Sequence, residues 1–179
     1  QIILNNGAKI LLKQTDFKKD EINFSAFSSG GYSNASLDQL YSAKFTEDIL
    51  GSADIGDLTV LEKINLYSQD VIDVIPYISE ESEGVNGYSN NENLETMFKL
   101  LYLNFTDLRV NQTHVDRFKK VKINEYKIDK ESPKYEYYLE ISKKTYQDHP
   151  RTQYVTDKKF EQIDLTEVQN FYKDRFIDG

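Results

Sequence analysis

Few side chains in this sequence could hold a metal ion or move a proton. The two histidines, His114 and His149, lie 35 positions apart, at an expected helix start and in an expected loop. A catalytic zinc site takes about three protein ligands, so this pair alone makes a weak case for a metal. We expect His114 to be a solvated helix residue. We expect His149-Pro150-Arg151 to fix the chain after a long helix, with Arg151 donating to backbone carbonyls or to a carboxylate.

The densest carboxylates are Glu80, Glu81 and Glu83, in a polar stretch that we expect to be a turn between two strands. Two carboxylates held close together raise the pKa of one of them, which is how acid/base pairs arise. Clustered acids in a turn are more often solvated charge, and we favour that interpretation. The spacing also differs from the D-x-[DN]-x-[DN]-G pattern of a calcium loop.

Nucleophilic and nucleotide chemistry have little support. The sequence contains no cysteine, which excludes a thiolate nucleophile, a disulfide and a cysteine-based metal site. Ser28, Ser29 and Ser82 lack a G-x-S-x-G context, and Gly30-Gly31 lacks the flanking pattern of a phosphate loop, so we interpret all five as turn residues. Four N-x-[ST] sequons are interpreted as chance matches in an asparagine-rich chain: Asn23, Asn34, Asn104 and Asn111.

The elements that would position these residues begin with a hairpin over residues 2–12. A half-buried strand over residues 22–27 follows, then a glycine turn at Gly30-Gly31. A helix over residues 37–50 comes next, with Ser36 as its cap and Gly51 as its stop. The local order is therefore strand, glycine turn, helix.

The rest of the chain predicts an α+β fold, with helices packed on one face of a mostly antiparallel sheet. Strands are expected at 71–78, where Pro76 indicates an edge or a strand end, and at 84–88. Leu58, Leu61 and Ile64 predict the apolar edge of a short helix, and Asn90 or Asn91 can cap a helix over 94–105. The apolar stripe of that helix should be core: Leu94, Met97, Phe98, Leu101, Tyr102 and Phe105.

Three further helices are predicted toward the C-terminus. One runs through Val115 to Tyr126, and one restarts after Pro133, which suits a first helical turn. The last is capped by Asp164, with Glu167 in the capping-box position. Tyrosines and lysines crowd the second of these helices, which either packs inside the domain or offers a partner surface: Lys134, Tyr135, Tyr138, Lys143, Lys144 and Tyr146.

Taken in order, several of these segments resemble a domain of the pitrilysin/insulinase metallopeptidases, the M16 family. They are the hairpin, the unit of residues 21–50, and four later matches: Pro76–Ile78, Ser82–Ser89, Asp148–Thr152 and the stretch from Asp164-Leu165 to Phe176. The resemblance implies a LuxS/MPP-like fold over residues 1–179 as one domain. It also implies further strands after the last helix, and without them one sheet edge is left unpaired.

Active members of that family carry an inverted zinc motif, H-x-x-E-H, on the helix after the glycine turn. The matching stretch here is about residues 43–47, Ala-Lys-Phe-Thr-Glu, which has neither histidine. Glu125 falls near the place of the family's third ligand. The resemblance is therefore to the family's non-catalytic domains, especially the first domain of the C-terminal half, with no catalytic, cofactor or metal residue in this chain and zinc in another domain of the parent.

Composition is consistent with a folded domain. Hydrophobic residues make up 39 % of the 179, with 13 Tyr and 10 Phe, and the formal net charge is −8. That charge disfavours nucleic acid and anionic membrane as the main partner, and no apolar run reaches the length of a membrane span. The chain begins at Gln1 in a strand and ends at Gly179 after a helix, so we expect a fragment of a longer protein.

Three functional hypotheses follow. The first is a non-catalytic structural or substrate-chamber domain of a zinc metalloendopeptidase. Its partners would be the other domains of the parent and a peptide or unfolded protein, and its location the periplasm or cell envelope of a bacterium. The second is an autonomous interaction module or an inactive processing-peptidase-like subunit. The third is a hydrolase whose acid/base residues the sequence does not reveal.

Overall fold

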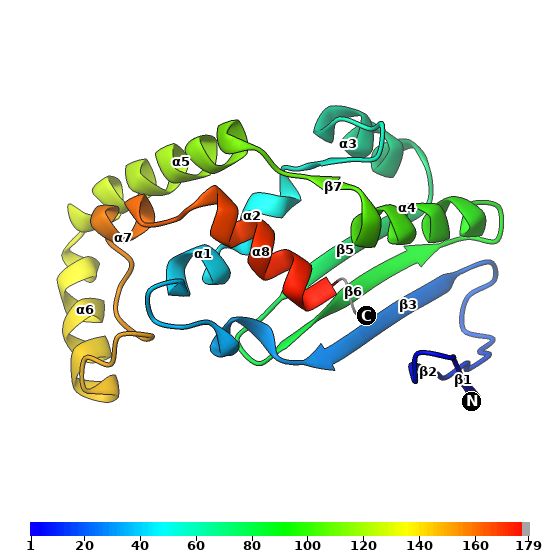
Figure 1. Ribbon diagram of the computed structural model, residues 1–179, viewed down its shortest axis with the longest axis horizontal. Coiled ribbons are helices and arrows are strands. Elements are labelled where there is room, and N and C mark those ends of the chain that lie inside the picture. Colours follow the sequence, from blue (N-terminus) through cyan, green and yellow to red (C-terminus); the bar gives the residue numbers. More distant parts are fainter. Residues whose placement is uncertain (177–179) are drawn as a thin grey trace.

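The structure is a computed structural model that describes residues 1–176 (Figure 1). We expected the chain to end at Gly179 after the last helix, and that end lies outside the described residues. The strands are β1 (Ile2–Ile3), β2 (Lys9–Ile10), β3 (Ile22–Ser29), β4 (Asp54–Ile55), β5 (Ile72–Ile78), β6 (Ser82–Ser89) and β7 (Leu108–Arg109). The helices are η1 (Gly31–Asn34), α1 (Leu40–Lys44), α2 (Thr46–Gly51), α3 (Val60–Gln69), α4 (Leu94–Thr106), α5 (Gln112–Lys130), α6 (Pro133–Tyr146), α7 (Asp157–Glu161) and α8 (Leu165–Phe176).

A three-stranded antiparallel sheet, in the order β3-β6-β5, is the centre of the fold. Ser89 of β6 pairs with Ile22 on one side and with Ile72 on the other. Side chains alternate between two faces, as in any strand. One face carries the buried Ile72, Val74, Ile78 and Val85, and the other carries the exposed Phe27 and Ile75. The mixed α+β class and the antiparallel sheet are thus confirmed.

Helix α4 packs on the buried face of β5 and β6 (Figure 1). Met97 and Leu100 enter the same core cluster as Val74, Val85 and Ile49 of α2. The predicted stripe is wrong in part, because Phe98 and Tyr102 are 52 % and 66 % exposed. The face of α4 that contacts the sheet is narrower than the apolar stripe. The N-cap position is Asn93 and not the expected Asn90 or Asn91. Asn93 makes no side-chain capping bond, and its amide donates to the Asn90 side chain at 2.9 Å.

The helix expected over residues 37–50 is instead two short helices that meet at Phe45. Ser36 does not cap either of them, since its hydroxyl donates to the Gln39 side chain, but α2 ends at Gly51 as predicted. The break has a packing cause. The Phe45 ring lies between Phe118 and Phe160, with ring centroids 5.4 and 5.3 Å away, so this aromatic contact fixes the direction of the chain at the junction.

Helix α3 begins with a capping box between Thr59 and Glu62. The predicted apolar edge is wrong in part. Leu61 and Ile64 are 69 % and 56 % exposed, whereas Leu58, just before the helix, packs against the core. Leu66 and Tyr67 pack against the core instead. Helix α3 lies beside β4 and β5, and its half-buried residues are Val60, Lys63, Leu66 and Tyr67.

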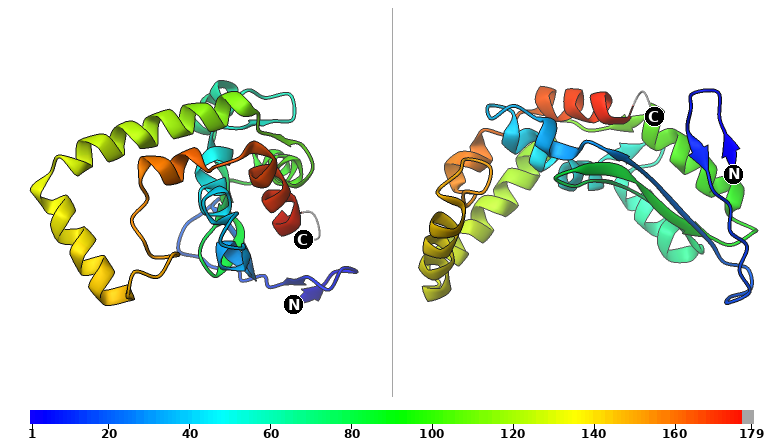
Figure 2. Two further views of the ribbon diagram at one scale, coloured as in Figure 1. Left: turned by 60° about the vertical axis from the view of Figure 1, so that its left-hand side comes forward. Right: turned by 90° about the horizontal axis from the view of Figure 1, so that it is seen from below.

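Helices α5, α6 and α7 form an arm at one end of the molecule (Figure 2). Its inner corner is a cluster of three tyrosines. Tyr135 of α6 packs edge-on against Tyr126 of α5, with ring centroids 6.1 Å apart. It packs in the same way against Tyr154, at 4.9 Å, in the loop of residues 147–156 that joins α6 to α7, here called the returning loop. Pro133 lies in the first turn of α6, as predicted, and Ser132 caps the helix. The tyrosines therefore tie two helices and the loop together.

Helix α8 returns to the core, and Asp164 caps it by accepting from the amides of Thr166 and Glu167 at 2.8 and 3.1 Å. Glu167 departs from the expected capping box. Its carboxylate accepts from the Ser42 hydroxyl of α1 at 2.6 Å, and the same hydroxyl accepts from the Asp164 amide at 3.0 Å. The Ser42 hydroxyl thus contacts both Asp164 and Glu167 at the start of α8.

The N-terminal hairpin is confirmed but short, since only residues 2–3 and 9–10 are paired. Its apolar side chains are exposed, with Leu11 and Leu12 at 77 % and 79 %. Across residues 1–176, no helix is both long and apolar enough to cross a bilayer.

Candidate functional site

The acidic turn contains one carboxylate that is not solvated. Glu83 lies in β6 and is only 4 % exposed, so its interpretation as a solvated turn residue is wrong. Its carboxylate accepts from the Gly31 amide and, at 3.1 Å, from the Ser28 hydroxyl. Glu80 and Glu81 are exposed. Glu83 is engaged by fixed donors of the fold, and the structure does not pair it with a second carboxylate.

The glycine turn is shaped around this carboxylate. Gly31 has φ +66°, a left-handed backbone conformation that glycine adopts without strain. A Cβ on Gly31 would collide with the carbonyls of Ser79 and Glu80, and one on Gly30 would collide with the Glu83 carboxylate. The two glycines therefore allow close packing and leave no open phosphate-binding loop. The burial of Glu83 was predictable from strand alternation. Glu83 and the core residue Val85 are two positions apart in one strand, so their side chains lie on the same face.

The stretch that matches the zinc motif is used for packing and capping. Ala43 is 1 % exposed, and the buried Thr46 hydroxyl donates to the Ser42 carbonyl at 2.7 Å. The Glu47 carboxylate accepts from the Ile78 amide of β5 at 2.7 Å. Glu47 is thus held against the sheet by a main-chain donor.

His114, His149 and Glu125 are not brought together. His114 is 9 % exposed and its Nδ1 accepts from the Asn111 amide at 3.2 Å, so it belongs to the cap of α5 and the expectation of a solvated residue is wrong. Glu125 lies eleven positions further along the same helix, roughly 16 Å of axial rise. Glu125 forms an ion pair with Lys122 at 2.9 Å. Within residues 1–176, no cluster of three or more metal-ligating side chains is present.

His149 is exposed and its Nδ1 accepts from the Arg151 amide at 3.3 Å. Arg151 reaches across the molecule to the loop after the glycine turn. Its guanidinium donates to the carbonyls of Tyr32, at 3.4 Å, and Ala35. The predicted structural role of His149-Pro150-Arg151 is confirmed.

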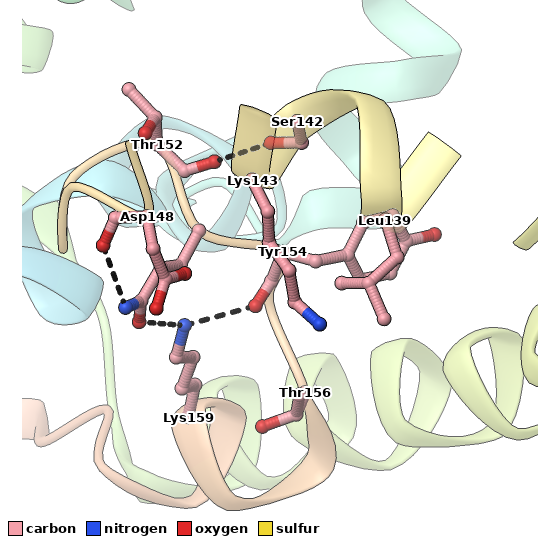
Figure 3. Close-up of a pocket in the computed structure, with 9 residues that line it drawn as sticks. Leu139, Ser142, Lys143, Asp148, Thr152, Tyr154, Thr156 and Lys159 are labelled. Atoms are coloured by element: carbon pink, nitrogen blue, oxygen red, sulfur yellow. Dashed lines mark hydrogen bonds between the residues drawn. The ribbon is translucent and has the colours of Figure 1, made fainter. Parts of the chain in front are cut away.

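A pocket that the sequence did not reveal lies between α6, α7 and the returning loop (Figure 3). Its volume is about 250 Å³. Lys159 enters it and donates to the Gln153 side chain at 2.8 Å and to the Tyr154 carbonyl at 3.0 Å. Burial lowers the pKa of Lys159, although Asp148 opposes the shift. The Ser142 hydroxyl is occupied by the Thr152 carbonyl, so the pocket holds hydrogen-bonding groups without a nucleophile and base in contact.

The tyrosine-rich helix α6 packs inside the domain through one tyrosine and exposes three others. Tyr135 is buried, whereas Tyr137, Tyr138 and Tyr146 are 63 %, 58 % and 53 % exposed. The rings of Tyr137 and Tyr138 meet at 66° with centroids 5.5 Å apart, so they do not form one flat platform. This leaves an exposed aromatic surface on the outside of the arm.

Two sequons fall on structural residues. Asn104 is 4 % exposed and donates to the Leu100 carbonyl at 2.9 Å, and Asn111 caps α5. Asn104 is inaccessible to a glycan in the folded chain, as expected of a chance match.

Comparison with known structures defines the fold as that of M16 peptidase domains. The structure matches the periplasmic protease PqqL from Escherichia coli with a TM-score of 0.79 and 15 % identity, over 97 % of this chain and 19 % of that one. It matches a peptidase M16 inactive domain from Pseudomonas fluorescens with a TM-score of 0.74 and 17 % identity, over 96 % of this chain and 42 % of that one.

In sequence, the chain is similar to the probable zinc protease PqqL of Haemophilus influenzae, at 20 % identity over 98 % of this chain and 19 % of that protein. No protein-family model matches the sequence. The chain thus spans about a fifth of the length of both PqqL proteins.

Proposed function

We propose that this chain is a non-catalytic structural domain of an M16-type zinc protease, where it forms part of the wall of a substrate chamber. The observation that carries the proposal is the bond between the Glu47 carboxylate and the Ile78 amide. In this fold the helix after the glycine turn is where an active member holds zinc. Here that segment is broken at Phe45, and its one carboxylate caps a strand.

The side chains of this segment do not fit a zinc ion. Zinc takes His, Cys, Asp or Glu ligands, and the two positions that would carry imidazoles are Ala43 and Glu47. Ala43 offers no donor, and Glu47 is committed to a main-chain amide. No catalytic step is therefore assigned to this chain, and zinc is assigned to another domain of the parent protein.

The exposed face of the sheet is the surface that we assign to the chamber. It carries Phe27, Ile75 and Tyr88, at 79 %, 51 % and 41 % exposure, beside the polar pair Ser25 and Asn86, which are joined at 2.9 Å. Apolar rings next to hydrogen-bonding groups suit unfolded polypeptide, which offers both kinds of contact. The similarity to a periplasmic protease supports a location in the periplasm or cell envelope of a bacterium.

A second candidate function is an autonomous interaction module or an inactive processing-peptidase-like subunit. The exposed Tyr137, Tyr138 and Tyr146 on α6 favour it, because tyrosine combines large contact area with a polar tip at protein interfaces. In this case the outside of the arm would hold the partner, and the open sheet face would have no role.

The test combines metal analysis with activity. The purified chain is incubated with zinc, dialysed and examined by elemental analysis and with a quenched peptide library. We expect no stoichiometric zinc and no turnover. Zinc near one equivalent together with hydrolysis would overturn the proposal and point back to His114, His149 and Glu125.

The parent protein separates the two candidates. Ile75→Asn changes the sheet face and Tyr137→Ala changes the arm, and both side chains are exposed, so neither should unfold the domain. A chamber wall predicts that Ile75→Asn raises KM for long peptides while Tyr137→Ala does not. The reverse pattern, or loss of a partner with Tyr137→Ala alone, would favour the interaction module.

A further inference from the structure

The pocket between α6, α7 and the returning loop is built by one short stretch of the chain. Every residue that lines it falls within positions 139–159 (Figure 3). Leu139 and Tyr154 supply apolar surface, and the other lining residues have polar or charged side chains. The volume of about 250 Å³ lies below that of cavities that hold drug-sized ligands, so the pocket suits a compact molecule with both kinds of group.

Two opposite charges line this pocket without touching each other. Within residues 1–176, neither Lys159 nor Asp148 belongs to an ion pair with a nitrogen–oxygen distance of 4 Å or less. Burial lowers the pKa of Lys159, and Asp148 lies near enough to oppose that shift. The ammonium and the carboxylate are therefore neighbours in one pocket, with a gap between their charged atoms.

The Lys159 ammonium is held in place by its neighbours. A lysine ammonium has three N–H donors, and two of them go to the Gln153 side chain at 2.8 Å and the Tyr154 carbonyl at 3.0 Å. The ammonium also lies over the Tyr41 ring, 5.5 Å from its centroid, in a cation–π contact that takes no hydrogen bond. A third donor is thus left for an acceptor inside the pocket.

Asp148 is placed by an unusual backbone. Gln147 and Asp148 have φ of +53° and +55°, a left-handed conformation that is uncommon outside glycine and is tolerated best by Asn and Asp. The Asp148 amide donates to the Lys143 carbonyl at 3.1 Å, and the Asp148 carbonyl accepts from the Gln153 side chain at 3.1 Å. Within residues 1–176 no donor reaches its carboxylate. The main chain of Asp148 is thus fixed while its charge stays available.

We propose that this pocket binds a small zwitterion, a free α-amino acid or a dipeptide, with its ammonium group on Asp148 and its carboxylate on Lys159. The charges of these two residues sum to zero, so a neutral ligand with separated charges matches them better than a simple anion or cation does. Lys143 is already paired with Glu140 at 3.2 Å. Leu139 would contact an aliphatic side chain of the ligand.

The zwitterion pocket lies on the arm, between α6 and α7, whereas the face assigned to the substrate chamber belongs to the sheet. The two proposals therefore stand or fall independently.

The test is a titration of the full chain, labelled with ¹⁵N, in which the amide signals of Thr152 and Gln153 are followed by NMR. Leucine and glycyl-leucine should shift these signals with a dissociation constant of roughly 1 mM. Leucinamide lacks the carboxylate and N-acetyl-leucine lacks the ammonium, so each should bind about tenfold more weakly or worse than leucine. The tighter of leucine and glycyl-leucine tells whether the ligand is an amino acid or a dipeptide.

Two variants assign the two charges. Asp148→Asn keeps the size of the side chain and tolerates the positive φ, so the fold is retained. It should weaken leucine binding about tenfold and leave N-acetyl-leucine unchanged. Lys159→Gln should weaken leucine and leave leucinamide unchanged. Lys158→Gln is the matched control, because it removes the same charge from the neighbouring exposed position, and it should change neither.

Three results would overturn the proposal. They are unshifted signals with leucine and glycyl-leucine well above the expected dissociation constant, equal binding of leucine and its two capped analogues, or unchanged leucine binding by Asp148→Asn. Lys159 also makes hydrogen bonds within the arm, so Asp148→Asn decides the question if Lys159→Gln fails to fold.

Discussion

Glu83 and Gly31 lie 52 positions apart, and the carboxylate of the first accepts a hydrogen bond from the amide of the second. The bond forms where the β3-β6 ladder ends and the chain turns into η1. The Glu83 side chain, and not a neighbouring strand, supplies the acceptor for the Gly31 amide. The turn and the strand therefore depend on one buried carboxylate.

Removal of that carboxylate should weaken the fold strongly. Glu83→Ala leaves the Gly31 amide and the Ser28 hydroxyl without their acceptor in a buried place, which costs about 2–4 kcal/mol of unfolding free energy. Glu81→Ala, two residues away and exposed, should change stability by no more than about 0.5 kcal/mol. Urea unfolding followed by circular dichroism compares the two, and equal midpoints would contradict the role assigned to Glu83.

Two glycine-to-alanine changes should act in opposite directions. Gly31→Ala combines a positive φ with collisions against backbone carbonyls, so we expect a loss of about 3 kcal/mol or failure to fold. Gly51→Ala meets open space at the end of α2 and should stabilise the chain by up to about 1 kcal/mol. Thermal melting distinguishes them. If Gly31→Ala melted like the wild type, the tight turn would have to be more adaptable than its geometry indicates.

The hydroxyl of Ser42 should be coupled to Glu167. Ser42→Ala removes a donor to the Glu167 carboxylate and an acceptor for the Asp164 amide, which should cost about 1–3 kcal/mol. Thr166→Ala, in the same turn but exposed, is the control. A double-mutant cycle of Ser42→Ala with Glu167→Gln should show a coupling of about 1 kcal/mol, and strict additivity would mean that the two side chains act separately.

Asp73 should make stability depend on pH. Burial raises the pKa of Asp73, while the Val74 amide and Lys63 act against the shift, and its Oδ1 has no hydrogen-bond partner. A raised folded-state pKa means that this contribution is complete below the unfolded-state value, near 4, and is lost as pH rises through the folded-state value. Asp73→Asn should therefore stabilise the chain at pH 7 by about 1 kcal/mol, with the gain vanishing in acid. A constant difference at every pH would refute this assignment.

Element types were largely predictable from sequence, because local patterns determined them. Apolar spacing placed α4, α5, α6 and α8, and Pro76 correctly marked β5 as an edge. Tertiary contacts decided the rest. Phe45 breaks the expected helix because its ring packs between two distant phenylalanines, and no local signal encodes those partners.

The exposure of individual side chains was harder to predict than whether a segment forms a helix or a strand. Phe98 and Tyr102 have helical apolar spacing, yet α4 contacts the sheet over a narrower face. Glu83 and His114 were assigned to solvent on residue type alone, whereas each accepts a hydrogen bond from a backbone amide that the fold delivers. The absence of histidines in residues 43–47 was readable directly, but the use of Glu47 as a cap for β5 requires the tertiary structure.

The tyrosine cluster at the corner of the arm has an optical consequence. The chain contains no tryptophan, so its near-ultraviolet signals come from tyrosine and phenylalanine. Tyr126, Tyr135 and Tyr154 are held at fixed mutual angles of 44°, 74° and 86°, and such rigid rings give dichroic bands that freely rotating rings lack. The near-ultraviolet spectrum thus contains a built-in reporter of whether α5, α6 and the returning loop are docked, readable without an added label.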